Sequence, residues 1–220
     1  MQGHRTRLLF VLAIVVAAGI GIVIATTGGD DDSQSAASGG CQQVTKPPPK
    51  KEQFKQPEPT LARGQDATAT VATSCGEFTI DLDTQQSPKT TNSFAFLADK
   101  GFYDGTIFHR ISPGFVVQGG DPTGTGNGGP GYTVTEPPPQ NTTYANGVVA
   151  MAKTSVEPPG ASGSQFFVVI APADAGLPPD YAVLGRVTDG MDVVNAIGKL
   201  GDAQEKPTQV VTIDKVTIEN

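Results

Sequence analysis

Hydrophobic and polar residues alternate along much of the chain, and this alternation predicts a domain made mainly of β-strands. The predicted strands are 67–73, 77–82, 106–111, 116–118, 148–151, 165–170, 182–187 and 210–218. In the last strand the alternation breaks at Asp214-Lys215, which predicts a β-bulge. The 27 glycines and 18 prolines are spread along the chain without a period, as expected where many turns join short strands.

Two segments have the spacing of helices instead. The first follows Ser87-Pro88, where serine suits the N-cap and proline the first turn, and its apolar residues recur three and four positions apart until Gly101. The second covers 191–197 and ends at Gly198. Eight strands with two helices among them favour a closed eight-stranded antiparallel barrel capped by two helices, because closure removes unpaired strand edges.

Residues 8–25 form an uninterrupted apolar run with Arg5 and Arg7 before it and three aspartates after it. Eighteen helical residues rise about 27 Å, which matches the hydrocarbon thickness of a bilayer. The charges on either side place the N-terminus inside the cell. We therefore expect residues 1–26 to be a transmembrane signal anchor, and the domain to be extracytoplasmic at the cell membrane, with a single membrane pass.

Two alternatives to an anchor are open. A cleaved signal peptide usually has a shorter apolar region that ends in a small-x-small site, and Ala25-Thr26-Thr27 is a poor one. A buried core helix of a soluble protein is disfavoured by the charged flanks and by the terminal position of the run.

Residues 27–65 have the composition of a tether. Its first part, 28–40, is rich in glycine, serine and aspartate, and 46–59 carries five prolines among charged residues. A glycine- and serine-rich sequence is flexible, whereas a proline-rich one is extended. Neither part buries enough apolar surface to fold alone. We expect this segment to hold the folded domain, residues 66–220, away from the membrane.

The chain has a net charge of −7, and 13 basic and 22 acidic side chains remain when Arg5 and Arg7 are set aside. This acidic balance argues against a nucleic-acid partner, which would require a basic face.

The two cysteines, Cys41 and Cys75, are candidates for a disulfide, since exported domains lie in an oxidising space. They are two unrelated thiols in the alternative interpretation. A lipidated Cys41 is disfavoured, because Ser38-Gly39-Gly40 lies well past the apolar run instead of closing it.

Two blocks of sequence point to a specific chemistry. The first is Phe108-His109-Arg110-Ile111-Ser112-Pro113-Gly114-Phe115-Val116-Val117-Gln118-Gly119-Gly120-Asp121, and the second is Gly163-Ser164-Gln165-Phe166-Phe167-Val168-Val169-Ile170. In this order they resemble the cyclophilin family of peptidyl-prolyl cis–trans isomerases. The resemblance covers roughly 67–219, and it implies a cyclophilin-like barrel that accelerates rotation about Xaa-Pro bonds.

Such an enzyme needs neither a covalent intermediate nor a metal. Rotation crosses a barrier of about 20 kcal/mol because it breaks the partial double bond of the amide. Twisting returns electron density to the proline nitrogen, so a fixed cation or donor near that atom stabilises the twisted state. An apolar socket must hold the proline ring, and further polar groups must hold the flanking backbone.

The resemblance assigns these roles to particular residues. Its catalytic positions are Arg110, Phe115 and Gln118, and its substrate-binding positions are Val116, Gly126, Ala152, Lys153, Gln165, Phe167, Leu177 and Tyr181. On composition alone Arg110 is better interpreted as an exposed arginine in a surface ion pair, and each phenylalanine as part of the core; the resemblance reverses this interpretation. Phe166 and Phe167 must nevertheless point to opposite faces of their strand, so one can fill the core while the other lines a groove.

The sequence departs from the family pattern at several positions. Lys153 stands where the family usually has asparagine, and Val116 replaces a common methionine. The family's tryptophan position falls near Gly176, and its histidine position near Tyr181. We expect isomerase activity to be kept and the binding of cyclosporin-like macrocycles to be weak.

Other chemistries find little support. Rotation about an Xaa-Pro bond requires no proton abstraction, so His109 is interpreted as a structural residue and not as a general base. The chain has only two histidines, and no cluster of ligands lies near His109, so no metal or cofactor is predicted and a hydrolase triad is disfavoured.

We expect the partners to be proline-containing segments of exported proteins, bound by a monomer. Two other functions are open. A non-enzymatic module would bind proline segments in the same groove, and a barrel-shaped carrier would hold a small apolar ligand.

Overall fold

The computed structural model describes residues 40–220 of the chain. The predicted anchor, 1–26, and the first part of the predicted tether lie outside these residues, so the domain boundaries stay predictions. Within 40–220 no helix has the length and apolar character needed to cross a bilayer.

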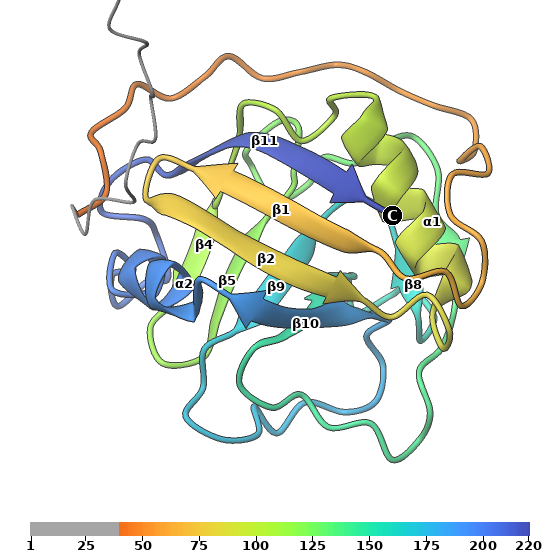
Figure 1. Ribbon diagram of the computed structural model, residues 1–220. Coiled ribbons are helices and arrows are strands. Elements are labelled where there is room, and N and C mark those ends of the chain that lie inside the picture. Colours follow the sequence, from red (N-terminus) through yellow and green to blue (C-terminus); the bar gives the residue numbers. More distant parts are fainter. Residues whose placement is uncertain (1–39) are drawn as a thin grey trace, which may run out of the picture. The chain divides into compact units, whose positions relative to one another are not determined.

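Nine strands form one antiparallel sheet in the order β3-β11-β1-β2-β10-β7-β9-β5-β4, and β6 pairs with β8 (Figure 1). The strands are β1 (Thr68–Thr73), β2 (Gly76–Leu82), β3 (Thr106–Ile107), β4 (Arg110–Ser112), β5 (Val116–Gly119), β6 (Val134–Thr135), β7 (Val148–Met151), β8 (Ala161–Ser162), β9 (Phe166–Val169), β10 (Val183–Asp189) and β11 (Thr212–Glu219). Helices α1 (Pro88–Asp99) and α2 (Met191–Gly198) lie at opposite ends of the curled sheet. The predicted class, mainly β with two helices, is confirmed.

The predicted count of eight strands in a closed barrel is wrong in one detail. The segment predicted as a single strand, 106–111, is two strands, because β3 pairs with β11 whereas β4 pairs with β5. Strands β3 and β4 are the two edge strands of the sheet, and Phe108-His109 connects them. The segment 106–111 therefore does not pair with one neighbour along its whole length. The predicted bulge is confirmed, since Ala72 pairs with Lys215 and Thr73 with Ile213.

The sheet is covered on both faces around β5, β7 and β9, and all four residues of β7 and of β9 are buried. One face packs on the main core, whose largest fully buried side chains include Phe78, Phe94, Phe102, Tyr103, Phe108 and Phe166. The other face packs in a second, smaller cluster made of Val116, Tyr144, Val148, Ala150, Phe167, Val169 and Ala171. Successive residues of a strand alternate between these two clusters.

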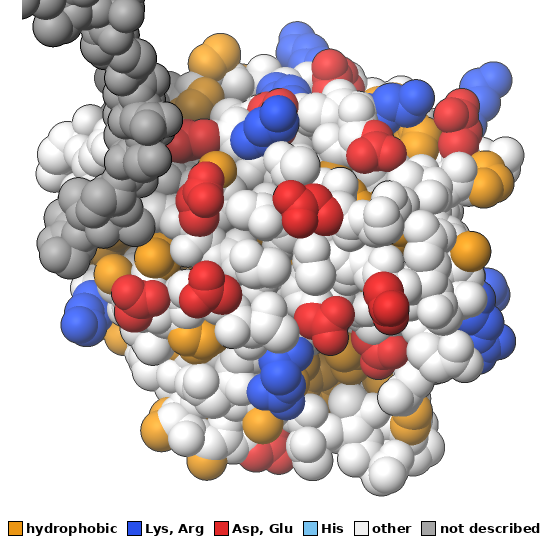
Figure 2. Space-filling model, in the orientation of Figure 1, with side chains coloured by type: hydrophobic (Ala, Val, Ile, Leu, Met, Phe, Trp, Pro, Cys, Tyr) orange, Lys and Arg blue, Asp and Glu red, His pale blue; other side chains and the backbone are white. Residues whose placement is uncertain are grey.

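Acidic side chains are spread over the outer face of the sheet shown in Figure 2. Exposed acidic residues of β2, β10 and β11 include Glu77, Asp81, Asp189 and Asp214. This distribution agrees with the net charge of −7.

Helix α1 is capped differently from the expectation. Ser87 occupies the N-cap position, but its side chain makes no capping hydrogen bond. Instead the carboxylate of Glu136 accepts the backbone N–H groups of Lys89 at 3.2 Å and of Thr90 at 2.9 Å. A carboxylate suits this position because the N-terminus of a helix carries partial positive charge.

Residues 41–60, which we name the N-terminal strap, run in extended form along the outside of the domain (Figure 1). Cys41 is joined to Cys75 in a disulfide. The Lys50 ammonium donates to three carbonyl oxygens in the segment 101–104, at 2.7, 2.9 and 3.2 Å. The Phe54 ring packs edge-on against Phe96, with the ring centroids 5.3 Å apart. This part of the predicted tether therefore lies on the domain.

Removing the disulfide should destabilise the domain. Because 34 residues separate the two cysteines, chain entropy predicts a loss of about 4 kcal/mol in the free energy of unfolding, as an upper estimate. Urea unfolding of the parent and of the double variant Cys41→Ser/Cys75→Ser would measure this loss. A reductant should lower the midpoint of the parent and leave that of the double variant unchanged; equal midpoints in all samples would contradict the prediction.

Candidate active site

One row of paired residues crosses four neighbouring strands on the sheet face that lies away from the main core. Arg110 of β4 pairs with Gln118 of β5, and Gln118 pairs with Phe167 of β9. Phe167 in turn pairs with Ala150 of β7. Directly paired residues of antiparallel strands project from the same face, so a cation, an amide and an aromatic ring lie side by side.

This row borders a cavity of about 180 Å³. The cavity is lined by Arg110, Phe115, Val116, Gln118, Ala152, Lys153, Phe167, Leu177 and Tyr181. All of them were predicted as site residues from the sequence, and the structure brings them together around one hollow.

The floor of the cavity is apolar and closely packed. Phe167 is only 5% exposed and Val116 only 2%. The ring of Tyr181 stands edge-on to that of Phe167, with 5.5 Å between the centroids, and the Lys153 ammonium lies 5.7 Å from the centroid of the Tyr181 ring. A small apolar ring can therefore contact aromatic and aliphatic surface on several sides.

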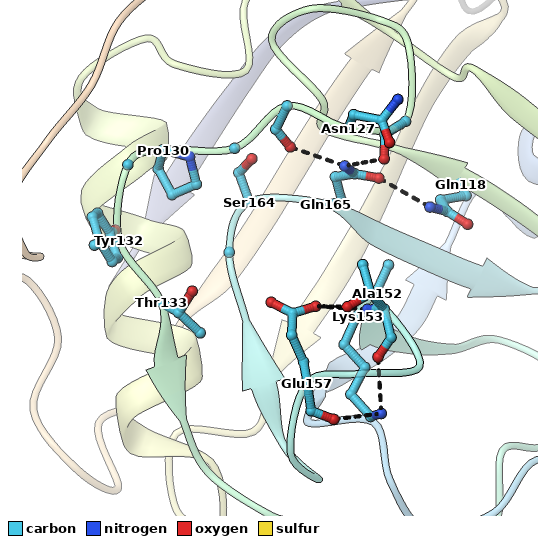
Figure 3. A pocket seen from close by; sticks show the side chains of 16 residues that line it. Gln118, Asn127, Pro130, Tyr132, Thr133, Ala152, Lys153, Glu157, Ser164 and Gln165 are labelled. Carbon is cyan, nitrogen blue, oxygen red and sulfur yellow. Dashed lines mark hydrogen bonds between the residues drawn. The ribbon is translucent and has the colours of Figure 1, made fainter.

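The other two predicted residues, Gly126 and Gln165, line a neighbouring cavity of about 400 Å³ (Figure 3). The two cavities share Gln118, Ala152 and Lys153. The Gln165 amide nitrogen donates to the carbonyl oxygen of Gly126 at 3.0 Å and to that of Gly128 at 2.9 Å. Gln165 thereby fixes the loop that forms the outer wall of this cavity.

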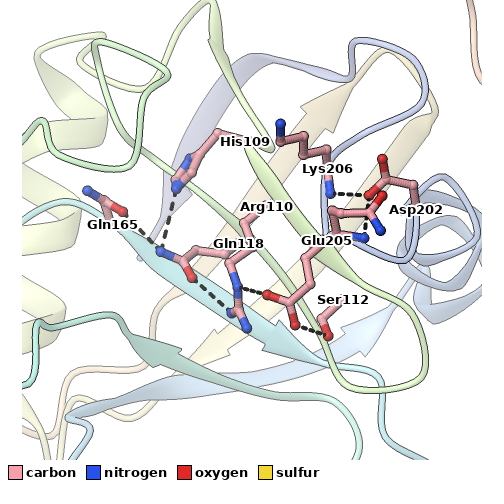
Figure 4. A network of polar contacts seen from close by, with 9 residues as sticks. His109, Arg110, Ser112, Gln118, Gln165, Asp202, Glu205 and Lys206 are labelled. Atoms are coloured by element: carbon pink, nitrogen blue, oxygen red, sulfur yellow. Dashed lines mark hydrogen bonds and ion pairs between the residues drawn. The ribbon is translucent and has the colours of Figure 1, made fainter.

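Arg110 belongs to a continuous polar network (Figure 4). Its Nε donates to the Glu205 carboxylate at 2.6 Å, and its Nη1 donates to the Gln118 amide oxygen at 3.3 Å. Gln118 then donates to the Gln165 amide oxygen at 3.0 Å. Hydrogen bonds from Arg110 and from Ser112 hold the pKa of Glu205 below its ordinary value. The sequence allowed two interpretations of Arg110, a residue in an ion pair or a residue of the groove. In the structure Arg110 forms an ion pair with Glu205 and also lines the cavity.

Comparison with known proteins identifies the arrangement. The model for the family described as "Cyclophilin type peptidyl-prolyl cis-trans isomerase/CLD" matches residues 68–218. The chain belongs to the cyclophilin family. It is accordingly a cyclophilin-type peptidyl-prolyl cis–trans isomerase, an enzyme class that acts on proline-containing peptides.

Named relatives agree with this assignment. The chain is 40% identical over 153 residues to "Peptidyl-prolyl cis-trans isomerase-like 1" of Neurospora crassa, which covers 67% of this chain and 91% of that one. It is 38% identical over 173 residues to "Probable peptidyl-prolyl cis-trans isomerase A" of Mycobacterium leprae, covering 70% and 93%. The crystal structure of a cyclophilin-type isomerase from Cryptosporidium parvum matches with a TM-score of 0.65 and 31% identity, covering 71% and 99%. The strap of this cyclophilin precedes the residues that match the family.

His109 of the cyclophilin lies behind the pocket instead of lining it. Its Nε2 is 3.5 Å from the Gln118 amide nitrogen, and its buried Nδ1 has no hydrogen-bond partner among the residues that the structure describes. Burial lowers the pKa of His109, and the nearby carboxylate of Asp121 offsets only part of that effect. The imidazole is therefore neutral at neutral pH. Within residues 40–220 no group of histidine, cysteine and acidic side chains is arranged to hold a metal ion.

Asp121 organises the loop that carries Gly126. Its carboxylate accepts the backbone N–H groups of Thr123, Thr125 and Gly126 at 2.7, 3.0 and 2.5 Å. Burial alone would raise the pKa of Asp121, but these hydrogen bonds, led by those from Thr123, outweigh it and lower the pKa.

Two supporting residues of the site were not found from the sequence. Glu205 lies 95 residues beyond Arg110 in a turn without a motif. Tyr144 holds Tyr181 through its hydroxyl group, which donates to the Tyr181 carbonyl oxygen at 2.7 Å and accepts the Tyr181 N–H at 3.0 Å. Burial raises the pKa of Tyr144 to about 12. Glu205 contacts Arg110 and Tyr144 contacts Tyr181, and each pair joins segments that are far apart in the sequence. The sequence pattern contains no signal for such long-range pairs.

The lowered pKa of His109 predicts how stability depends on pH. The unfolded chain binds a proton at this residue below its ordinary pKa of about 6.5, whereas the folded chain binds it only at lower pH. Stability should therefore be full above the ordinary pKa and decrease as pH falls toward the folded pKa. Urea unfolding at pH 7.5 and 5.5 should show a larger loss for the parent than for His109→Asn. Equal losses in the two proteins would contradict this.

Proposed function

We propose that this cyclophilin isomerises Xaa-Pro bonds of exported proteins and that Arg110 stabilises the twisted amide in the transition state. The observation that carries the proposal is that the Arg110 guanidinium and the Phe167 ring line one small cavity. The cation and the apolar socket that the chemistry requires are thus within reach of one proline residue.

The catalytic step is electrostatic. As the amide twists, resonance is lost and the proline nitrogen becomes a hydrogen-bond acceptor. A guanidinium N–H placed at that nitrogen interacts with the twisted form more strongly than with either planar isomer, so it lowers the barrier. Arg110 suits this role because its side chain is about one third exposed, at 35%, and the guanidinium presents its donors in a rigid, planar fork.

The remaining residues hold the peptide while it rotates. Phe115, Val116, Phe167 and Leu177 enclose the ring, and Tyr181 forms the pocket edge. Gln118, Gln165 and the backbone at 152–153 orient the chain on either side of the proline. A relative from Cryptosporidium parvum, 32% identical with a TM-score of 0.64, was crystallised "in the presence of dipeptide ala-pro", which supports Ala-Pro peptides as test substrates.

Replacing Arg110 by alanine should lower the catalysed cis–trans exchange rate of an Ala-Pro peptide by about 10²–10³-fold, the range seen when one preorganised donor is removed. NMR exchange spectroscopy with the full chain in detergent micelles would measure it. The matched control is Arg186→Ala, since Arg186 is exposed on β10 and, among the described residues, its side chain makes one hydrogen bond, to the Asn146 carbonyl oxygen. The control should keep the rate of the parent.

Other outcomes would favour other functions. Peptide binding without acceleration by any of the three proteins would leave a module that binds proline segments. An apolar ligand retained through purification would favour a carrier.

We also propose that residues 1–26 anchor the enzyme in the cell membrane by a single pass and that 27–65 connect this anchor to an extracytoplasmic domain, 66–220, which works as a monomer. The apolar run between basic and acidic residues supports the anchor. The disulfide between Cys41 and Cys75 supports an oxidising compartment, and hence exported clients.

Expression of the full chain in bacteria should place it in the membrane fraction, where it resists extraction by high salt and carbonate. A variant without residues 1–26 should stay in the soluble fraction, because its membrane contact is lost. Fractionation followed by mass measurement would decide between the two interpretations of the N-terminus. Loss of about the first 26 residues from the mature protein would establish a cleaved signal peptide instead.

A further inference from the structure

The turn at 202–206 contains an unusual backbone conformation. Glu205 has a φ of 61°, and it is the only residue other than glycine with positive φ among residues 40–220. This left-handed conformation costs free energy in a residue with a side chain, because Cβ crowds the following carbonyl oxygen. A glycine would fit the turn without that cost.

Several hydrogen bonds fix this turn in place. The Asp202 carboxylate accepts the N–H groups of Gln204 and Lys206, both at 2.8 Å. The Glu205 carbonyl oxygen accepts the N–H of Ile111 at 3.0 Å, which ties the turn to strand β4. The left-handed backbone thus brings the Glu205 side chain over β4, beside Arg110 (Figure 4).

The carboxylate contacts one particular edge of the arginine. One oxygen of Glu205 accepts from Arg110 Nε at 2.6 Å, and the other accepts from the Ser112 hydroxyl at 2.6 Å. Arg110 Nη1 donates to Gln118. Of the five N–H groups of a guanidinium, these contacts use two, and the other three have no partner in the part of the chain that the structure describes.

We propose that Glu205 is a positioning residue for the catalytic arginine: held by Ser112 and by its strained turn, its carboxylate fixes the Nε edge of Arg110, so that the free N–H groups face the pocket. The inference rests on the proposed role of Arg110. An unrestrained arginine side chain samples many rotamers and would lose that freedom during each turnover. With Glu205 in place the orientation exists before the substrate binds.

The two effects of Glu205 on Arg110, fixing its orientation and offsetting its charge, should change the reaction rate in opposite directions. The carboxylate offsets part of the positive charge of Arg110, so if charge alone mattered, removing Glu205 would speed the reaction. Glutamine at 205 keeps an oxygen for Nε without the charge, whereas glycine removes the contact and also relieves the backbone strain. The two substitutions therefore separate the two effects.

The test compares kcat and KM of the full chain in detergent micelles with those of Glu205→Gly and Glu205→Gln, using the Ala-Pro peptide. Glu205→Gly should lower kcat by about 10- to 100-fold with little change in KM, because the contact matters in the transition state. Glu205→Gln should lie between this variant and the parent. Gln204→Ala, in the same turn but with no side-chain contact to the arginine, is the matched control and should retain the parent kcat.

Stability provides the second readout. Glu205→Gly should unfold at a urea concentration no lower than the parent does, since glycine relaxes the turn, so a loss of activity cannot be assigned to unfolding. In the Arg110→Ala background, Glu205→Gly should lower kcat no further, because both substitutions remove the same function.

Three results would overturn the inference. An unchanged or raised kcat in Glu205→Gly, together with a large loss in Arg110→Ala, would overturn the role of Glu205 and leave the proposed function intact. Parent-like kcat in Arg110→Ala would remove both. If Glu205→Gly fails to fold, Glu205→Ala decides, because it also removes both side-chain contacts of Glu205, and an unchanged kcat in that variant would overturn the role of Glu205.

Discussion

The active site depends on the pairing register of strands β4, β5, β9 and β7. This register alone places Arg110, Gln118 and Phe167 on one face in one row. A slip by one residue would turn Phe166 toward the groove and Phe167 toward the main core, and would do the same to every other side chain of the strand. Because both faces of β9 are buried, the slip would mismatch two apolar clusters at once.

Hydrophobic burial is what holds that register. Fully burying a large apolar side chain contributes about 1.5–3 kcal/mol, and the alternating residues of β5 and β9 are divided between the two clusters. Close packing adds a second constraint at the end of β5. A Cβ on Gly119 would lie 3.1 Å from the Ile107 carbonyl oxygen, so only glycine lets the strand end beside β3 without displacing it. The same packing that stabilises the sheet therefore fixes the row of functional residues.

The polar side chains of the site are linked to one another by a continuous series of hydrogen bonds. It runs from Glu205 through Arg110 and Gln118 to Gln165, and from there to the carbonyl groups of the glycine-rich loop. In such a network each group is oriented by its neighbour, and half-buried amides avoid the cost of lost hydrogen bonds.

The glycine-rich loop is supported from two sides. Asp121 and Gln165 bind it from within the fold. From outside, the strap contributes Gln53, whose amide donates to the Gly129 carbonyl oxygen at 3.0 Å, and the N–H of Phe54, which donates to the Pro130 carbonyl oxygen at 2.7 Å. A segment that precedes the family's domain thus helps to shape one wall of the groove.

Local pattern was enough to predict both helices and most of the strands, because these depend on alternation or on helical spacing, but it missed the short strands β6 and β8. The residues that line the pocket were predicted from the resemblance to the cyclophilin family. Contacts between distant segments left no such mark. Glu136 replaces Ser87 as the cap of helix α1, and Tyr144 holds Tyr181. The split of 106–111 into two strands has the same origin, since its two halves find different partners.

The edge of the pocket shows how these distant contacts adapt the family's site. Gly176, near the position of the family's tryptophan, is exposed and offers no side chain to the cavity. Tyr181 is instead held edge-on to Phe167 and to Tyr144, with centroid distances of 5.5 and 6.0 Å. Tyr144 binds both backbone polar groups of Tyr181, and these two hydrogen bonds hold this edge in place without an indole ring. The pocket thus has an aromatic floor in Phe167 and an aromatic edge in Tyr181, and the edge is held by hydrogen bonds to a residue from a distant segment.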